Sequence, residues 1–508
     1  MILFIGDGMS VGTVTGVRIW KGQKDGFTGE ESVLEYDKFP HFGYSKTFNT
    51  NSQVPDSAGT ATAYLTGVKT KRRVLGLDAG INVGDCASTF GHEVDSILKM
   101  VKNNGMPVGI VTTTRITHAS PGGCYSHVPE RDWEADTELP QEAVANGCKD
   151  IARQMVEDND IDVMMGGGRY RFYMESQTDP DTGLPGARKD KDLIAEWQQK
   201  YQNRASAEYI TKRQQLLDLD IENTDYLLGL FSFSEINFDI ERTPDEPTLA
   251  EMTEVAIKIL QKKSKNSGGR YFLFVEGGRV DHGHHFTEAK HAITDGLALE
   301  VAIAKAKQLT TSNTLMVLSS DHGHTMSFAG YPKRGNPIFG KIFEDAFKLP
   351  YTTLGYYTGR NAYTHLMPTF TLKKHRTDIT NVDTEANEYE QQSFVPSVYE
   401  THGGEDVAIF ATGPWSHLIH SVHEQHYITH VMMFAGCVGD YFDTCRDSPY
   451  ISGALTDKDA DVPARFRAKS QGQPPVPTES SASLPSPLWQ TIFTVVLLWK
   501  FTVKTLIE

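Results

Sequence analysis

Three short apolar runs in this chain each end at an acidic residue. They are ILFIGD, which ends at Asp7, YFLFVE, which ends at Glu276, and TLMVLSSD, which ends at Asp321. Their length and their content of Val, Ile, Leu and Phe predict buried strands. Because the functional residues of an open α/β sheet gather at the carboxyl ends of its strands, these distant segments are expected to bring hard oxygen ligands to one place. This pattern is typical of a multi-metal hydrolase.

Composition limits the class of protein and of partner. The chain has 508 residues, of which 39% are hydrophobic and 22% charged, as in an ordinary soluble globular protein. The formal net charge of −16 argues against nucleic acid as the main partner. It does not exclude an anionic substrate, since bound cations can dominate the local field. The five cysteines contain no CxxC pair, which leaves open both two disulfides with one free thiol and five buried thiols.

Strand-like and helix-like segments alternate along the chain. Further predicted strands are 108–114, 161–166 and 407–413, and predicted helices are 92–105, 248–263 and 284–308. This alternation predicts an α/β fold, a three-layer α/β/α sandwich with a mostly parallel central sheet. The polar stretch 170–220 reads as mainly helix and loop, and the Tyr-rich, irregular residues 331–400 read as an inserted subdomain.

The two ends of the chain bear on where the protein is located. The first residues, MILFIGDGMS, predict strand and turn, which leaves a cytosolic protein or a missing natural N-terminus, and we favour the second. Residues 446–487, rich in Ser, Pro and Gln in their second half, are expected to be a disordered stalk. The hydrophobic tail 488–508 resembles a lipid-anchor attachment signal, although Lys500 and Lys504 depart from that pattern. Its uncharged run is shorter than the ~20 residues of a transmembrane helix.

Two segments combine carboxylates and imidazoles in patterns that suit a metal ion. Asp281 and His285 are four residues apart at a predicted helix start, so both side chains lie on one face and suit Zn²⁺. The alternative is a polar helix cap with exposed histidines, which three His within four residues disfavour. Asp321 and His322 are adjacent on a turn after a strand, where they can reach one ion or form a structural hydrogen bond. His402, beside two glycines, is weak evidence by itself.

Ser57 is the candidate nucleophile. It begins a predicted helix, whose N-terminus favours anions, although a serine there is commonly a simple cap. No histidine base lies nearby in the sequence, so metal coordination is the other way to activate the hydroxyl. His118 and Ser120 follow the predicted strand 108–114 and face the same edge of the sheet. Arg131 suits a bidentate phosphate clamp, with an ordinary surface arginine as the alternative.

Taken together, these segments resemble alkaline phosphatases of the animal type. The matching stretches run from residue 1 to about residue 445 and are GDGM (6–9), VPDSAGTATAY (54–64), VTTTRITHASP (111–121), DIDVMMGGGR (160–169), FLFVEGGRVDHGHH (272–285), SSDHGH (319–324), GYPKRG (330–335) and THGGEDVAIFATGP (401–414). Their order and combination are highly specific. The resemblance implies a phosphomonoesterase that works through a phosphoserine with two zinc ions and one magnesium ion.

The resemblance also implies which residues form the site. The implied ligands are Asp281, His285 and His402 for the first zinc, Asp7, Asp321, His322 and the nucleophile Ser57 for the second zinc, and Asp7, Ser120 and Glu276 for magnesium. Arg131 matches the family's phosphate-clamping arginine, and His118 matches a residue near the magnesium waters. Imidazoles on zinc and an all-oxygen set on magnesium agree with the ligand preferences of the two ions.

Further expectations follow from the resemblance. Residues 1–330 and 401–445 would form the catalytic core and 331–400 the crown domain, with Tyr331 reaching the partner's site in a homodimer. The implied disulfides are Cys86–Cys148 and Cys437–Cys445, which leave Cys124 free. The implied calcium ligands are Glu196, the Phe231 carbonyl and Glu246, with Ser232 where the family has a carboxylate. The protein would sit on the extracellular side of the plasma membrane, held by a glycosylphosphatidylinositol (GPI) anchor.

Two other functions compete with this interpretation. The first is a phosphodiesterase or sulfatase of the same superfamily, against which Ser57, Arg131 and the three-metal ligand set argue. The second is an inactive extracellular binding protein, against which the complete set of ligands and nucleophile argues. The sequence departs from the family at its start, where the signal peptide and the helical arm that contributes to the dimer are absent.

Overall fold

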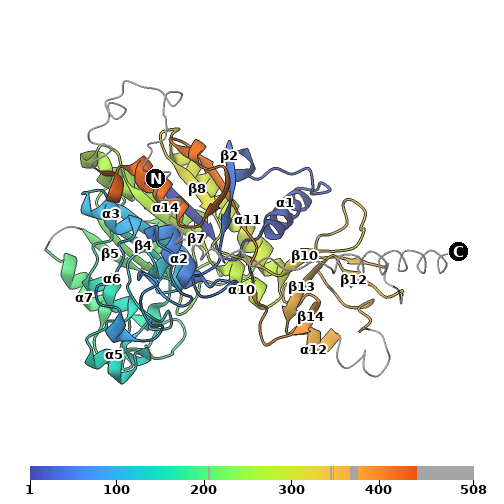
Figure 1. Ribbon diagram of the computed structural model, residues 1–508, viewed down its shortest axis with the longest axis horizontal. Coiled ribbons are helices and arrows are strands. Elements are labelled where there is room, and N and C mark those ends of the chain that lie inside the picture. The colour runs from blue at the N-terminus through green and yellow to red at the C-terminus, as the bar shows by residue number, and fades with distance from the viewer. Residues whose placement is uncertain (204–205, 344–345, 347, 366–375, 443–508) are drawn as a thin grey trace, which may run out of the picture. The chain divides into compact units, whose positions relative to one another are not determined.

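A ten-stranded sheet organises the chain (Figure 1). The computed structural model describes residues 1–203, 206–343, 346, 348–365 and 376–442. All of them belong to one of the two units into which the chain divides, Met1–Asp459. The predicted stalk, the predicted tail and Cys445 lie outside the described residues.

The sheet is mostly parallel, as predicted. Its order is β17-β2-β16-β8-β1-β7-β3-β4-β6-β5, and only β16 runs antiparallel to its neighbours. The strands are β1 (Ile2–Gly6), β2 (His41–Lys46), β3 (Val108–Arg115), β4 (Val163–Gly167), β5 (Ala207–Ile210), β6 (Tyr226–Leu230), β7 (Phe272–Gly277), β8 (Met316–Ser319), β16 (Val407–Thr412) and β17 (Ser421–Glu424).

Helices cover both faces of this sheet, which gives the predicted three-layer α/β/α sandwich. One group comprises α1 (Val11–Lys24), α9 (Leu249–Lys263), α10 (Arg279–His285) and α11 (Ala289–Leu309), in which α11 contacts each of the other three. A second group comprises α2 (Ser57–Thr66), α3 (Ile97–Asn103), α4 (Ala119–Gly122) and α14 (Tyr427–Gly436). The remaining helices are α5 (Gln141–Ala145), α6 (Ile151–Glu157), α7 (Leu193–Tyr201), α8 (Arg213–Leu217) and α12 (Asn361–His365).

The hydrophobic core explains why these segments form these elements. Every residue of β1 is buried, as expected for a strand covered on both faces. In α9, buried Met252, Val255 and Ile259 recur at helical spacing and pack in the same core cluster as residues of β3 and β7. The helix begins at a capping box, in which Glu251 N–H donates to Thr248 Oγ1 at 3.1 Å.

Local structure differs from the predicted elements at three points. The predicted helix 92–105 contains only the seven residues Ile97–Asn103, because the Ser96 side chain caps it at that point. The predicted helix 284–308 is divided into α10 and α11 by Thr287, whose φ of 60° is left-handed. The polar stretch 170–220 contains an edge strand, β5, besides helix and loop.

In its described residues, the segment 331–400, predicted to be a crown domain, contains small strands that do not join the main sheet. It carries β11 (Lys341–Ile342), β12 (Tyr351–Thr352), β13 (Leu354–Gly359) and β14 (Ser393–Pro396), and β13 pairs with both β14 and β10 (Met326–Phe328). The structure forms the Cys86–Cys148 disulfide, and Cys124 is a buried free thiol. The Cys437–Cys445 pairing stays a prediction. Within the described residues no helix has the length and apolarity needed to cross a membrane.

Candidate active site

The three strand-end acids lie together because their strands are neighbours. β1 is the central strand of the parallel trio β8-β1-β7, and Ile5 pairs with both Ser319 and Glu276. Asp7 follows β1 by one residue, and Asp321 follows β8 by two. All three carboxylates are fully buried. Asp321 Oδ1 accepts a hydrogen bond of 2.8 Å from Gly8 N–H, which ties the end of β8 to the turn after β1.

This group of carboxylates lacks the partners that buried charges need. Both oxygens of Asp7 and Glu276 Oε1 have no hydrogen-bond partner among the described residues. Burial, and then the charges of Asp321, Asp281 and Glu276, raise the pKa of Asp7 well above its ordinary value. Burial raises the pKa of Glu276 to about 7, although the hydroxyls of Thr112 and Thr114, which donate to Glu276 Oε2, oppose the rise. Bound cations would supply the missing partners, so the donor set fits the predicted metals.

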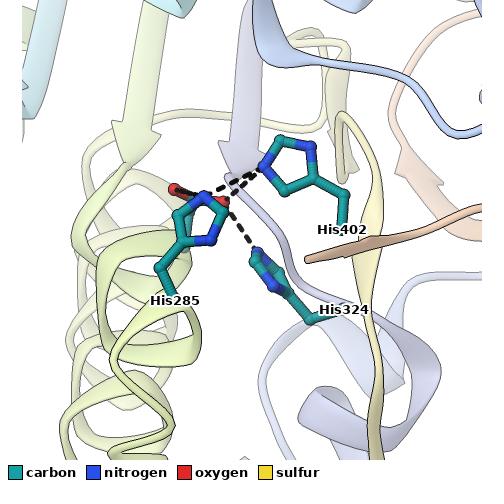
Figure 2. A group of neighbouring side chains, drawn as sticks. His285, His324 and His402 are labelled. Carbon is teal, nitrogen blue, oxygen red and sulfur yellow. Dashed lines mark hydrogen bonds and ion pairs between the residues drawn. The ribbon is translucent and has the colours of Figure 1, made fainter. Parts of the chain in front are cut away.

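A second group surrounds Asp281. His285 Nε2 lies 3.3 Å from Asp281 Oδ2 and 3.1 Å from His402 Nε2. His402 Nε2 lies 3.4 Å from Asp281 Oδ1, and His324 Nε2 lies 2.7 Å from the same oxygen. Figure 2 shows the three histidine rings converging on one point, although they come from different segments. These four residues are close enough to share one ion.

Hydrogen bonds at Nδ1 of His285 and His402 fix which nitrogen of each ring is free to bind a metal. His285 Nδ1–H donates to the Glu400 carbonyl at 2.6 Å, and His402 Nδ1–H donates to the Pro55 carbonyl at 2.8 Å. Burial lowers the pKa of both rings, which keeps them neutral. Both Nε2 atoms are therefore unprotonated, each with a lone pair, and they face each other at 3.1 Å. Two converging lone pairs of this kind suit Zn²⁺.

His324 and Glu400 are the residues that sequence reasoning missed. The Glu400 carboxylate accepts hydrogen bonds from His324 Nδ1–H and from both the N–H and the hydroxyl of Thr325, the last two at 2.7 and 2.6 Å. Burial disfavours charge on His324, but Glu400 and Asp281 raise its pKa to about 10. A charged His324 therefore lies between two carboxylates and orients Asp281. The DHGH motif was a signal for His324, but nothing in the sequence distinguished Glu400.

We expect Glu400→Gln to weaken metal retention at the Asp281 group. The variant keeps an acceptor but removes the charge that holds His324 and Thr325 in place, and supporting residues of this kind typically contribute about 10–100-fold to metal affinity. Competition with a chelator measures this loss. Glu385→Gln, the same change at an exposed glutamate of the preceding segment, is the matched control and should leave retention nearly unchanged. Retention equal to the wild type in Glu400→Gln would contradict the assigned role.

Ser57 lies at the N-terminus of α2, beside the first group of acids. Asp56 caps the helix by accepting from Gly59 N–H at 3.1 Å, so Ser57 is its first residue. Ser57 Oγ lies 3.2 Å from His322 Nε2, which itself lies 3.0 Å from Asp321 Oδ2. His322 Nε2 is also 3.7 Å from Asp7 Oδ1. The four predicted ligands of the second zinc are thus in one cluster.

Arg131 and His118 lie on the other side of this cluster. Arg131 Nη1 donates to Asp56 Oδ2 at 3.2 Å, and its Nη2 lies 3.0 Å from His118 Nε2. Burial disfavours charge on Asp56, but Arg131 and two backbone N–H groups hold its pKa below the ordinary value. His118 can share an ion with Asp7 and Glu276. Ser120, two residues on, is buried in α4.

The two carboxylates among the predicted calcium ligands are engaged in other contacts. The Glu246 carboxylate accepts hydrogen bonds from Asn237 and Thr243, and Glu196 pairs with Lys191 at 2.9 Å. The calcium site stays a prediction. Tyr331, the predicted dimer contact, is 91% exposed.

Comparisons with known proteins agree on one family. A family model described as alkaline phosphatase matches residues 1–438. The tissue-nonspecific isozyme of alkaline phosphatase from Rattus norvegicus is 47% identical over 455 residues, which cover 88% of this chain and 85% of that protein. The human protein of the same name is 46% identical over 455 residues, which cover 88% of this chain and 85% of that protein. The alkaline phosphatase of Gadus morhua is 47% identical over 450 residues, covering 86% of this chain and 92% of that protein.

Solved structures agree on the fold. The alkaline phosphatase of the Antarctic bacterium TAB5 aligns with a TM-score of 0.58 at 21% identity, covering 86% of this chain and 98% of that one. The Thermus thermophilus enzyme aligns with a TM-score of 0.59 at 20% identity, covering 85% and 90%. With the family model matching most of its length and relatives at nearly half identity, the chain belongs to the alkaline phosphatase family, whose members are phosphoric monoester hydrolases.

Proposed function

We propose that this chain hydrolyses phosphate monoesters through a phosphoserine formed on Ser57, at a site with two zinc ions and one magnesium ion. The observation that carries the proposal is the position of Ser57 Oγ. It lies at a helix N-terminus, 3.2 Å from His322 Nε2, beside the Asp7 carboxylate, whose two buried oxygens have no hydrogen-bond partner among the described residues. A hydroxyl in that position meets both a phosphate-binding helix end and a cation-binding group.

The donor chemistry assigns the three ions. Asp281, His285 and His402 would hold the first zinc, with bare Nε2 atoms directed at it. The second zinc would be held by Asp7, Asp321, His322 and Ser57, and magnesium by the oxygens of Asp7, Ser120 and Glu276. Asp7, with both oxygens unsatisfied, would bridge the last two ions. When bound, the ions lower the pKa of hydroxyl groups and neutralise the charge that develops in the transition state.

The proposed reaction consists of two successive displacements at phosphorus. Ser57 Oγ attacks phosphorus as the bond to the alcohol oxygen breaks, so the alcohol leaves and a phosphoserine remains. Water then attacks the same phosphorus, which releases inorganic phosphate and restores the serine hydroxyl. Arg131 and the N-terminal end of α2 bind the non-reacting oxygens in both steps, with Asp56 orienting the Arg131 guanidinium.

Rates on an aryl phosphate monoester and on the matching diester test this function. We expect much faster hydrolysis of the monoester at alkaline pH and loss of activity in a chelator, with recovery on adding zinc and magnesium. A monoester-to-diester ratio near or below one would favour the phosphodiesterase alternative. Absence of turnover in metal-loaded protein would favour the inactive binding protein.

We also propose that the enzyme is a homodimer that uses the segment 331–400. Tyr331 is 91% exposed, and Tyr357 and Phe394, whose rings lie 6.0 Å apart, are 60% and 66% exposed. Exposed aromatic residues of this kind are enriched at protein interfaces. Sedimentation of the wild type against Tyr331→Ser and Phe394→Ser tests the proposal. A monomeric wild type would refute it.

The location of the enzyme is likewise a proposal. The composition of residues 488–508 supports attachment to the extracellular face of the plasma membrane through a GPI anchor. Release of the protein from cells by a phosphatidylinositol-specific lipase tests it, and retention on the membrane would contradict it. The Cys437–Cys445 disulfide and the calcium at Glu196, Phe231 and Glu246 complete the proposals carried over from the family.

A further inference from the structure

Arg73 has a backbone conformation that arginine rarely adopts. Its φ is 73°, in the left-handed region that favours glycine. In this conformation its N–H donates to Asp56 Oδ1 at 2.9 Å, and its carbonyl accepts from Arg131 N–H at 2.9 Å. The backbone of Arg73 therefore joins the cap of α2 to the segment that carries the phosphate-clamping arginine.

The side chain of Arg73 binds the two acids on either side of Arg131. Its Nε lies 2.9 and 2.8 Å from the two Glu130 oxygens, and its Nη2 lies 2.6 Å from Glu130 Oε1. The same Nη2 also donates to Asp132. The hydrogen bonds that Arg73 donates to Glu130, together with the nearby charges of Glu130 and Asp132, raise the pKa of Arg73. One guanidinium thus engages both carboxylates that flank Arg131 in the sequence.

These two carboxylates would otherwise oppose the function of Arg131. A free carboxylate next to Arg131 can form the same bidentate pair that phosphate forms, and so compete for the guanidinium. It also repels a phosphate dianion, and this repulsion weakens with salt. Asp132 is 72% exposed at its side chain, so its charge faces the solvent from which substrate arrives.

We propose that Arg73 is a positioning residue that holds Glu130 and Asp132 away from Arg131 and so keeps the Arg131 guanidinium available for phosphate. This inference rests on the proposed role of Arg131 in phosphate binding. It assigns to Arg73 an effect on phosphate affinity rather than on the chemical step, because the hydrogen bonds of Arg73 described above join it to Asp56 and to the segment 130–132, none of which is the nucleophile or a predicted metal ligand.

Arg73→Gly tests the proposal most cleanly, because glycine suits the left-handed backbone and removes only the side chain. We expect the inhibition constant of inorganic phosphate, and KM for an aryl phosphate, to rise roughly three- to tenfold at low ionic strength, with kcat much less affected and the difference shrinking in salt. Unchanged phosphate inhibition in Arg73→Gly would overturn the proposal.

Neutralising the released acids is the decisive control. The triple variant Arg73→Gly, Glu130→Gln, Asp132→Asn should recover phosphate affinity close to the wild type, which a merely structural loss would not do. Failure of this rescue would overturn the proposal. Arg72→Gln removes a neighbouring exposed positive charge and should raise the inhibition constant of phosphate less than Arg73→Gly does. An equal rise would show that Arg73 acts only through its net positive charge, which would contradict the proposal.

A second variant keeps the proposal testable should Arg73→Gly fold poorly. The double variant Glu130→Gln, Asp132→Asn, in which Arg73 is retained, should bind phosphate as tightly as the wild type or more tightly. Weaker binding would contradict the proposal. Wild-type turnover and the Ser57→Ala variant test the proposed function separately. A failure of the Arg73 inference is therefore distinguishable from a failure of that function.

Discussion

Replacing Ser57 with alanine is expected to abolish turnover of phosphate monoesters while the metal ions stay bound. Ser57 is the only predicted ligand of the second zinc that also attacks phosphorus, so its loss removes the acceptor of the phosphoryl group. The remaining donors Asp7, Asp321 and His322 are charged or imidazole ligands and still hold the ion. We expect a decrease in kcat of roughly 10³-fold or more. Steady-state rates on an aryl phosphate and elemental analysis of the same samples measure both outcomes.

Ser52→Ala is the matched control for this change. Ser52 precedes the same helix, and its exposed hydroxyl donates to the Val54 carbonyl at 2.6 Å, outside the metal-binding groups. Its removal should leave kcat nearly unchanged. Turnover by Ser57→Ala at a rate close to that of the control would show that another group accepts the phosphoryl.

Replacing Asp7 with asparagine is expected to lower the content of two ions at once, because Asp7 would bridge the second zinc and magnesium. Activity should fall with the metal content. Asp281→Asn is the contrasting variant, since it should affect the first zinc only. Elemental analysis after gel filtration distinguishes the two patterns. Full metal content in Asp7→Asn would contradict the bridging assignment.

The same Asp7→Asn change should raise the thermal stability of the protein when no metal is bound. The pKa of Asp7 is raised in the folded state, so the native chain holds this proton more tightly than the unfolded chain, and stability falls as pH rises through that pKa. Asparagine removes this buried charge. In chelator at pH 8 we therefore expect Asp7→Asn to unfold at a higher temperature than the wild type, and a lower temperature would contradict the electrostatic account.

Much of the site could be predicted from the sequence because strand ends carry it. Asp7, Glu276 and Asp321 follow apolar runs, and parallel strands that are neighbours bring their carboxyl ends to one edge whatever their separation in sequence. Ser57 could be predicted for a similar reason, since a cap residue and a helix start are local patterns.

The parts that sequence could not reveal depend on tertiary contacts or on backbone angles. Glu400 lies in a loop, and only the folded chain brings its carboxylate to His324 and its carbonyl to His285. Arg73 matters because of a left-handed φ, for which arginine gives no signal. The division of α10 from α11 at Thr287 has the same origin, since the residues on both sides have helical periodicity.

The most direct test of the central claim is to trap the phosphorylated enzyme. Metal-loaded wild type, mixed with an aryl phosphate and quenched in acid, should yield one phosphorylated peptide, and fragmentation should locate the phosphate on Ser57. The account predicts that this peptide is absent from Ser57→Ala treated in the same way. A phosphate on any other residue, or turnover without a phosphorylated peptide under conditions that preserve phosphoserine, would contradict it.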